Sequence, residues 1–137
     1  MYHMVNNIFL SNLRDAHNMN MIRANNIEIV VRLSEGDNAS IYPTNIDFHN
    51  FEIEDNCLFK TELINYSKFI RGIIDNNRDK NILIHCNEGQ SLSVSVIIFY
   101  LMTKYKLSFD ESRDYIKKIK PDIRPNDAFE QVLRTFG

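Results

Sequence analysis

The segment over residues 81–93 constrains the fold of this chain more than any other. Residues 82–84, Ile-Leu-Ile, form a short apolar run that predicts a buried strand of a central sheet. His85 and Cys86 follow, then a small polar loop with Gly89, then an apolar-periodic stretch that predicts a helix. Such a loop turns its N–H groups toward a helix N-terminus, which binds anions and favours the thiolate form of a cysteine. The segment therefore predicts a phosphate-binding loop with a nucleophilic thiol at its base.

This loop resembles the signature loop of the cysteine-dependent protein phosphatases, and most closely that of their compact dual-specificity branch. In that family His-Cys is followed by five residues, an arginine, and a serine or threonine. The positions that match are His85, Cys86, Gly89, Ser91 and Ser93. One position departs from the pattern, because the expected arginine is Leu92.

The resemblance extends along nearly the whole chain. Residues 8–16 are similar to the opening strand and turn of the family, and Asp55 falls where the family carries its general-acid loop. Pro125 and Asn126 with Phe129 resemble the closing Pro-Asn-x-x-Phe segment. The resemblance implies an α/β fold, with a central mixed β-sheet flanked by α-helices. It also implies a single dual-specificity-phosphatase-like domain over residues 1–137.

The hydrophobic pattern predicts the same mixture of elements. Strands are expected over residues 27–33, 48–53 and 82–84, beside an apolar run at 8–10. Helices are expected over 61–75 and 90–104, from a capping box at 108–111 to residue 119, and after an Asn126 cap. Asn12 is expected to cap a short helix, and residues 34–40 to form a loop. The side chains expected to face inward from the last helix are Phe129, Val132, Leu133 and Phe136.

Length and composition narrow the function classes. The chain has 137 residues, enough for one domain with its own core. A net charge of -2 gives no electrostatic case for nucleic acid or an anionic membrane as a partner. Cys57 and Cys86 fit neither a metal site nor a disulfide framework, so we expect no metal, no cofactor and a reducing, cytoplasmic location. The richness in Asn and Ile is typical of an AT-biased genome, viral or protozoan, and a viral source would mean host-cell cytoplasm or virion.

The resemblance implies a role for each loop residue. Cys86 takes the nucleophile position, His85 orients the loop, and the Ser93 hydroxyl bonds to the cysteine sulfur. Asp55 takes the position of the general acid, with Glu54 and Asp47 as nearby alternatives. The full expected phosphate loop is His85, Cys86, Asn87, Glu88, Gly89, Gln90, Ser91, Leu92 and Ser93.

Leu92 removes a central part of this machinery. The family's arginine grips two phosphoryl oxygens, and two hydrogen bonds to a charged group contribute roughly 3–6 kcal/mol together. Their loss slows the reaction by about two to four orders of magnitude. Glu88 adds a negative charge to a loop that must attract phosphate. The arginines considered as replacements are Arg124, which is the best placed, Arg113 and Arg32.

These observations predict a pseudophosphatase that binds a phosphoprotein or another protein partner. Two alternatives stay open. The first is a weakly active protein tyrosine/serine/threonine phosphatase with a cysteine nucleophile. The second is a scaffolding or dimerising domain with a vestigial loop. The sequence does not fix the oligomeric state, and a homodimer is one of the options.

Overall fold

The computed structural model describes residues 1–35 and 41–136, and these contain a five-stranded mixed sheet. The strands are β1 (Tyr2–Val5), β2 (Ile8–Ser11), β3 (Ile27–Leu33), β4 (Asp47–Phe51) and β5 (Asn81–His85). Their order across the sheet is β1-β2-β5-β3-β4; β1 is antiparallel to β2, and the other pairs are parallel. The predicted mixed sheet is confirmed. Most of the loop predicted over residues 34–40 lies outside the described residues.

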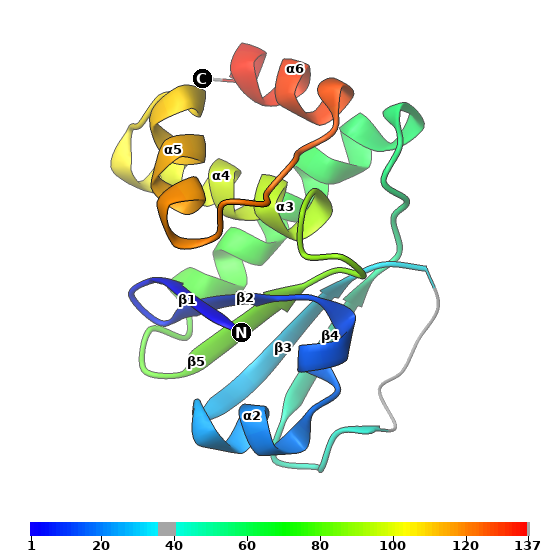
Figure 1. Cartoon of the computed structure of the whole chain (residues 1–137), viewed down its shortest axis with the longest axis vertical. Coiled ribbons are helices and arrows are strands. Elements are labelled where there is room, and N and C mark those ends of the chain that lie inside the picture. The colour runs from blue at the N-terminus through cyan, green and yellow to red at the C-terminus, as the bar shows by residue number, and fades with distance from the viewer. Residues whose placement is uncertain (36–40, 137) are drawn as a thin grey trace.

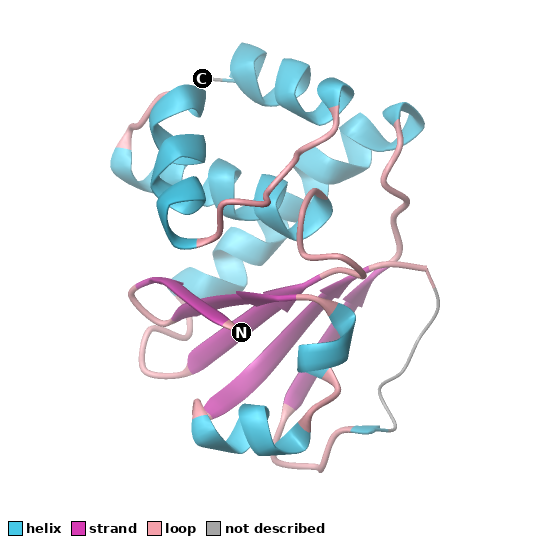
Figure 2. Cartoon of the chain, viewed as in Figure 1, coloured by secondary structure: helices cyan, strands magenta, loops and turns pink. Residues whose placement is uncertain are grey.

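Helices cover both faces of this sheet (Figures 1 and 2). One face carries α3 (Lys60–Asp75), α4 (Leu92–Tyr105), α5 (Phe109–Ile119) and α6 (Asp127–Phe136). The other carries the short helices α1 (Leu13–Ala16) and α2 (Met19–Ala24). A 3-10 turn, η2 (Cys57–Phe59), leads into α3. The α/β architecture expected from the sequence is therefore present.

The alternation of side chains along β5 divides the core into two parts. Ile82 and Ile84 are fully buried under α3–α6, whereas Leu83 packs on the opposite side with Ala16 and Ile22. Every residue from 92 to 102 of α4 is buried, so this helix is the centre of the larger core. A fully buried helix after a fully buried strand holds the intervening loop rigidly between them.

Three helix starts follow the local chemistry expected of them. The Asn12 side chain accepts the Asp15 N–H at the start of α1. Ser108 and Glu111 form the predicted capping box of α5. The Asn126 carboxamide oxygen accepts a backbone N–H three residues into α6, at 2.8 Å.

Four predicted details differ from the structure. The edge strand β1 was missed, because only Met4 of it is buried and the segment lacks an apolar run. β4 ends at Phe51, and Ile53 is buried from the loop that follows. α4 begins at Leu92 rather than at residue 90, because the phosphate loop still occupies residues 86–91. Phe136 is 42% exposed rather than inward-facing, because it lies in the last turn of α6.

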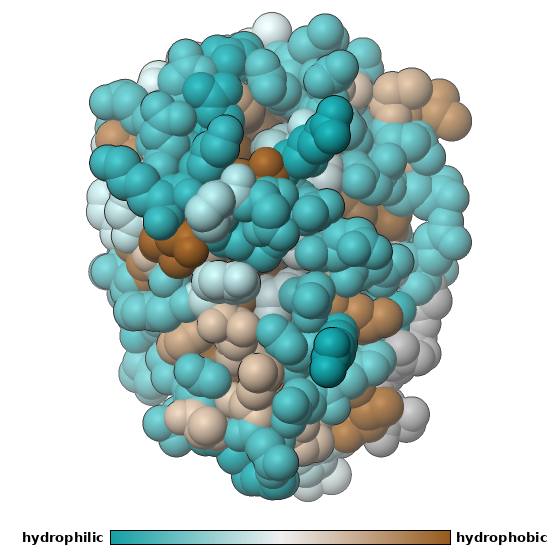
Figure 3. Space-filling view, viewed as in Figure 1, coloured by the Kyte–Doolittle hydropathy of each residue, from teal (hydrophilic) through white to brown (hydrophobic). Residues whose placement is uncertain are grey.

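The surface in the view of Figure 3 is mostly hydrophilic, with small separate hydrophobic patches. Within the described ranges, no helix combines the length and the apolar character needed to cross a bilayer.

Candidate functional site

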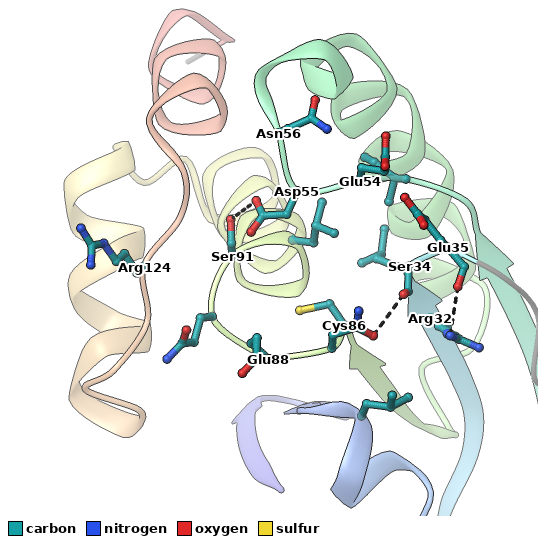
Figure 4. A pocket seen from close by; sticks show the side chains of 16 residues that line it. Arg32, Ser34, Glu35, Glu54, Asp55, Asn56, Cys86, Glu88, Ser91 and Arg124 are labelled. Carbon is teal, nitrogen blue, oxygen red and sulfur yellow. Dashed lines mark hydrogen bonds between the residues drawn. The ribbon is translucent and has the colours of Figure 1, made fainter.

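The loop between β5 and α4 forms the floor of a pocket of about 870 Å³. The pocket opens at the carboxyl ends of the parallel strands β3 and β5, where α/β sheets bind ligands. Side chains from β3, the segment after β4, the Cys86 loop and the segment before α6 converge on it (Figure 4). Sequence positions that are far apart thus meet around one thiol.

Backbone contacts hold the loop on several sides. The Asn87 carbonyl accepts the Leu13 N–H at 3.0 Å, and the Gln90 carbonyl accepts the Arg124 N–H at 2.7 Å. The Asn87 side-chain oxygen accepts the Ser34 hydroxyl at 3.1 Å. Elements before β3, after β3 and before α6 therefore fix the path of the loop.

Gly89 is required by its backbone geometry. Its φ of +70° lies in the left-handed region, which disfavours side chains. A Cβ built there would also lie 3.0 Å from the Ser11 carbonyl oxygen. The tight approach of the loop to the end of β2 explains why a glycine stands here.

The Cys86 thiol is buried and has two hydrogen-bond partners. Its sulfur lies 3.0 Å from the Ser93 hydroxyl oxygen and accepts the Gly89 N–H at 3.2 Å. His85 lies directly behind it, fully buried, with Nδ1 3.4 Å from the Cys86 carbonyl oxygen. Burial lowers the pKa of His85 to about 4, so its imidazole is neutral at physiological pH. The predicted contact between the Ser93 hydroxyl and the Cys86 sulfur is therefore present, while the nucleophilic role of Cys86 stays a prediction.

Asp55 lies in the same pocket as Cys86. One of its carboxylate oxygens accepts the Ser91 hydroxyl at 2.7 Å and the Asn126 side-chain N–H at 2.7 Å. Ser91 in turn accepts the Asn126 backbone N–H at 3.0 Å. Of the two alternatives, Glu54 also lines the pocket, whereas Asp47 begins β4 and is absent from its lining. The general-acid role of Asp55 stays a prediction, and the structure places its carboxylate beside the Cys86 loop.

The sequence did not reveal this Asp55–Ser91–Asn126 network. Ser91 was matched to a pattern without a role, and Asn126 was expected only to cap a helix. Asn126 caps the helix and also joins the network. Its side-chain oxygen caps α6, while its backbone N–H donates to Ser91 and its side-chain N–H donates to Asp55. The only signal for it in the sequence is Asn126, a short polar residue that directly follows Pro125.

Leu92 begins α4 with its side chain 6% exposed. It belongs to the same apolar cluster as Cys86 and Ile53, and all three line the pocket. An apolar wall therefore stands where the family's arginine is expected. A hydrocarbon side chain donates no hydrogen bond to a phosphoryl group.

The arginines considered as replacements do not converge on Cys86. In Figure 4 the Arg124 guanidinium points away from the thiol. Arg32 lies on the opposite side of the pocket, where its Nη2 donates to the Glu35 carbonyl at 3.1 Å. Arg113 is absent from the lining and forms ion pairs with neighbouring aspartates on α5.

Carboxylates outnumber these cations among the described lining residues. Glu35, Glu54, Asp55 and Glu88 line the pocket together with Arg32 and Arg124. The pKa of Glu35 is raised, because its carboxyl group is hydrogen-bonded to that of Glu54 and repelled by its charge. Across the described residues, no three His, Cys, Asp or Glu side chains group in a way that could hold a metal ion. The electrostatic surroundings of the thiol are thus unfavourable to a phosphate dianion.

Comparison with known proteins gives a consistent picture. Residues 8–137 match the family model described as "Dual specificity phosphatase, catalytic domain". The human dual specificity protein phosphatase 9 is 29% identical over 132 residues, which are 95% of this chain and 34% of the relative. A protein of Acanthamoeba polyphaga mimivirus named for the tyrosine-protein phosphatases is 34% identical over 91 residues, 61% of this chain and 42% of the relative. The chain therefore spans less than half the length of both relatives.

The fold also matches solved structures over almost the whole chain. The crystal structure of DUSP15 superposes with a TM-score of 0.86 at 24% identity, covering 99% of this chain and 86% of that one. The human tyrosine phosphatase-like serine/threonine/tyrosine-interacting protein superposes with a TM-score of 0.83 at 19% identity. The two chains are then covered to 99% and 94%. At these identities the likeness establishes the fold alone.

Proposed function

Because the chain belongs to the dual specificity phosphatase catalytic-domain family, we propose that it is a pseudophosphatase of that family. It hydrolyses phosphate esters not at all or very slowly, and it acts by binding a protein partner. The observation that carries this proposal is Leu92, a buried leucine at the position of the phosphate-gripping arginine.

The size of the defect follows from the missing contacts. A bidentate arginine supplies two charge-assisted hydrogen bonds to the transferred phosphoryl group. Together they contribute roughly 3–6 kcal/mol, so their loss slows turnover by about two to four orders of magnitude. A clamp requires placement within about half an ångström, and neither Arg32 nor Arg124 is aimed at the thiol in Figure 4.

The charges around the pocket support the same proposal. Among the lining residues that the structure describes, four are carboxylates and two are arginines. A phosphorylated partner that entered would depend on backbone N–H groups at the start of α4 rather than on a cationic side chain. Binding of a phosphoprotein through this loop is therefore expected to be weak.

The fold by itself favours neither catalysis nor binding. Similar folds occur in proteins named as phosphatases and in a human protein named as phosphatase-like and interacting. The residues of the site have to decide between these functions, and Leu92 is the residue that departs.

A second candidate function is that of a weakly active phosphatase. The retained environment of Cys86 favours it, because Ser93 and Gly89 still contact the sulfur and Asp55 still lies in the pocket. These groups can support attack and proton transfer even without the clamp. Any residual turnover would then depend strictly on Cys86.

One assay separates the two. Hydrolysis of p-nitrophenyl phosphate is measured for the natural protein, Leu92→Arg and Cys86→Ser. We expect little or no turnover by the natural protein and a gain of about two orders of magnitude or more for Leu92→Arg. Slow turnover by the natural protein that Cys86→Ser abolishes would favour the weakly active phosphatase. Turnover at the level of active family members, abolished by Cys86→Ser, would overturn the proposal.

A titration tests whether the loop still binds anions. Inorganic phosphate is added up to millimolar concentration while the amide signals of residues 86–93 are followed by NMR. Shifts of the Gly89 and Ser93 amides support weak phosphate binding. The absence of any shift leaves the scaffolding alternative, in which the loop is vestigial.

Both cysteines are free thiols, Cys57 exposed and Cys86 buried. Free thiols are typical of a reducing compartment, which supports the proposed intracellular location.

A further inference from the structure

A second hollow, which we call the α3–α4 groove, shares no lining residue with the Cys86 pocket. It has a volume of about 570 Å³ and lies between α3 and α4, with the last turn of α6 at its side. Its apolar lining includes Phe99, Met102 and Phe136. The first two are buried core residues, so the base of the groove is fixed by the core itself.

Cations surround this apolar base. Lys68 and Arg71 from α3 and Lys106 after α4 all line the groove, and none of its described lining residues is a carboxylate. Arg71 is partly neutralised by Asp75 at 3.5 Å. The Lys68 ammonium group lies 5.4 Å from the centre of the Phe136 ring, which places positive charge directly over the apolar surface.

Phe136 joins the two kinds of surface. Its ring packs on Phe99 with a centroid distance of 4.9 Å, yet the residue is 42% exposed. A large aromatic side chain exposed among lysines offers an anchor that a partner's apolar side chain can cover. Burial of that ring would add to binding free energy in proportion to the area removed from water.

The hollow continues past the end of α4. An adjoining depression of about 410 Å³ shares Met102, Lys106 and Leu107 with the groove. It is also lined by Glu111 and by Arg134, which is paired with Asp110 and Glu130, so the cationic rim is confined to the groove itself. Figure 1 places the end of α6 next to the start of α5, which brackets this continuation. The surface is therefore elongated, which suits a peptide segment better than a compact small molecule.

We propose that the α3–α4 groove is a docking site for an acidic amphipathic segment of a protein partner. Apolar side chains of that segment pack on the exposed Phe136 ring, above the buried Phe99 and Met102, and its carboxylates face Lys68 and Lys106. This proposal goes beyond the loss of catalysis, because it names a surface and the chemistry of what binds there. The argument is charge complementarity: a cationic rim around an apolar base selects acidic residues interspersed with apolar ones.

An anionic membrane is a poorer fit to the same charges. The groove is concave, and carboxylates of Asp75 and Glu130 lie on the surrounding elements, with that of Glu111 in the adjoining depression. The whole chain carries a net charge of -2. A bilayer surface would meet these carboxylates together with the lysines, whereas a narrow segment in the groove meets mainly the lysines.

The test measures fluorescence anisotropy of a labelled probe peptide with the full chain. The probe has about 14 residues, with Leu and Phe at helical spacing and Glu and Asp between them. One control peptide carries Gln in place of the acids, and another carries Ser in place of the apolar residues. We expect the probe to bind at least about tenfold more tightly than either control, and more weakly at high salt.

Charge-reversed variants locate the binding. Lys68→Glu combined with Lys106→Glu is expected to weaken binding by about tenfold or more. Lys117→Glu with Lys118→Glu, on the exposed side of α5, carries the same charge change and should leave affinity unchanged. Circular dichroism checks that both proteins are folded.

Several outcomes overturn the proposal. These are absence of probe binding, equal binding of all three peptides, or equal loss in both charge-reversed variants. Binding to phosphatidylserine vesicles that is lost in Lys68→Glu/Lys106→Glu, without probe binding, would assign the groove to a membrane instead. Cys86→Ser should bind the probe normally, so failure here is distinguishable from failure of the proposed function.

Discussion

The Cys86 sulfur lies 3.0 Å from the hydroxyl oxygen of Ser93, the residue that directly follows Leu92 in the sequence. The thiol therefore keeps its hydrogen-bonded partner one residue beyond the position where the phosphate clamp is missing. The loss in this site is local, because Ser93 and Gly89 still contact the sulfur.

This relationship predicts that Ser93 becomes important once the clamp is restored. In a Leu92→Arg background, Ser93→Ala removes one hydrogen-bond partner of the sulfur and should lower turnover by about tenfold or more. The measurement is p-nitrophenyl phosphate hydrolysis by single and double variants. Ser95→Ala is a matched control, because Ser95 is equally buried on α4 but its hydroxyl makes no hydrogen bond within the described residues. Equal losses in the two serine variants would contradict a specific role for Ser93.

Asn126 is predicted to act through two separate contacts. Asn126→Ala removes the α6 cap and should lower the free energy of unfolding by about 1–2 kcal/mol. Asn126→Asp retains a capping oxygen but sets a second carboxylate against Asp55, where the amide now donates at 2.7 Å. Two adjacent carboxylates repel and bind a proton more readily in the folded state than in the unfolded state. The Asp variant should therefore gain stability relative to the Ala variant as pH falls.

Urea unfolding of both Asn126 variants at pH 7 and pH 5 measures this difference. The free energy of unfolding of Asn126→Asp, measured relative to that of Asn126→Ala, should be higher at pH 5 than at pH 7. If the two variants keep a constant difference at both pH values, Asp55 and residue 126 do not interact in solution.

Two glycines give opposite predictions for the same substitution. Gly89→Ala forces a side chain into a left-handed backbone and toward the Ser11 carbonyl, so it should destabilise the chain by more than about 1 kcal/mol. Gly72→Ala, in α3, meets nothing within 4 Å and should stabilise it by about 0.5–1 kcal/mol. Thermal and urea unfolding of the two variants check this. A similar effect at both positions would contradict the strained path of the phosphate loop.

The fold was predictable where local chemistry and burial agree. Residues 27–33 are mostly apolar and β-branched, with only Glu28 and Arg32 as charged residues, and they form β3 with the expected bounds. The Ser108–Glu111 capping box likewise sets the start of α5. β1 was not predictable, because an edge strand with one buried side chain has no strong pattern of its own. Its pairing with β2 comes from the tertiary structure.

Only those parts of the site that lie on consecutive residues could be predicted from the sequence. The position of Cys86 before a helix and the substitution at Leu92 could be read from consecutive residues. The Asp55–Ser91–Asn126 network joins residues up to 71 positions apart, and no periodicity records such contacts. The α3–α4 groove was missed for the same reason, since Phe136 was expected to be inward and its exposure depends on where α6 ends.

The buried His85 predicts a specific pH dependence of stability. Burial is the main cause that lowers its pKa in the folded state from 6.5 to about 4. The contact with the Cys86 carbonyl opposes this shift, and the charges of Arg32 and His17 add to it. Above pH 6.5 the imidazole is neutral in both folded and unfolded chains, and its contribution to stability is complete. Between pH 6.5 and 4 the unfolded chain binds a proton that the folded chain resists, so the free energy of unfolding decreases as pH falls.

The comparison of natural protein with His85→Asn measures this contribution. Relative to the variant, the natural protein should lose up to about 3 kcal/mol of unfolding free energy between pH 7 and pH 4. Parallel curves for the natural protein and His85→Asn would mean that the imidazole behind Cys86 is protonated as readily in the folded chain as in the unfolded one.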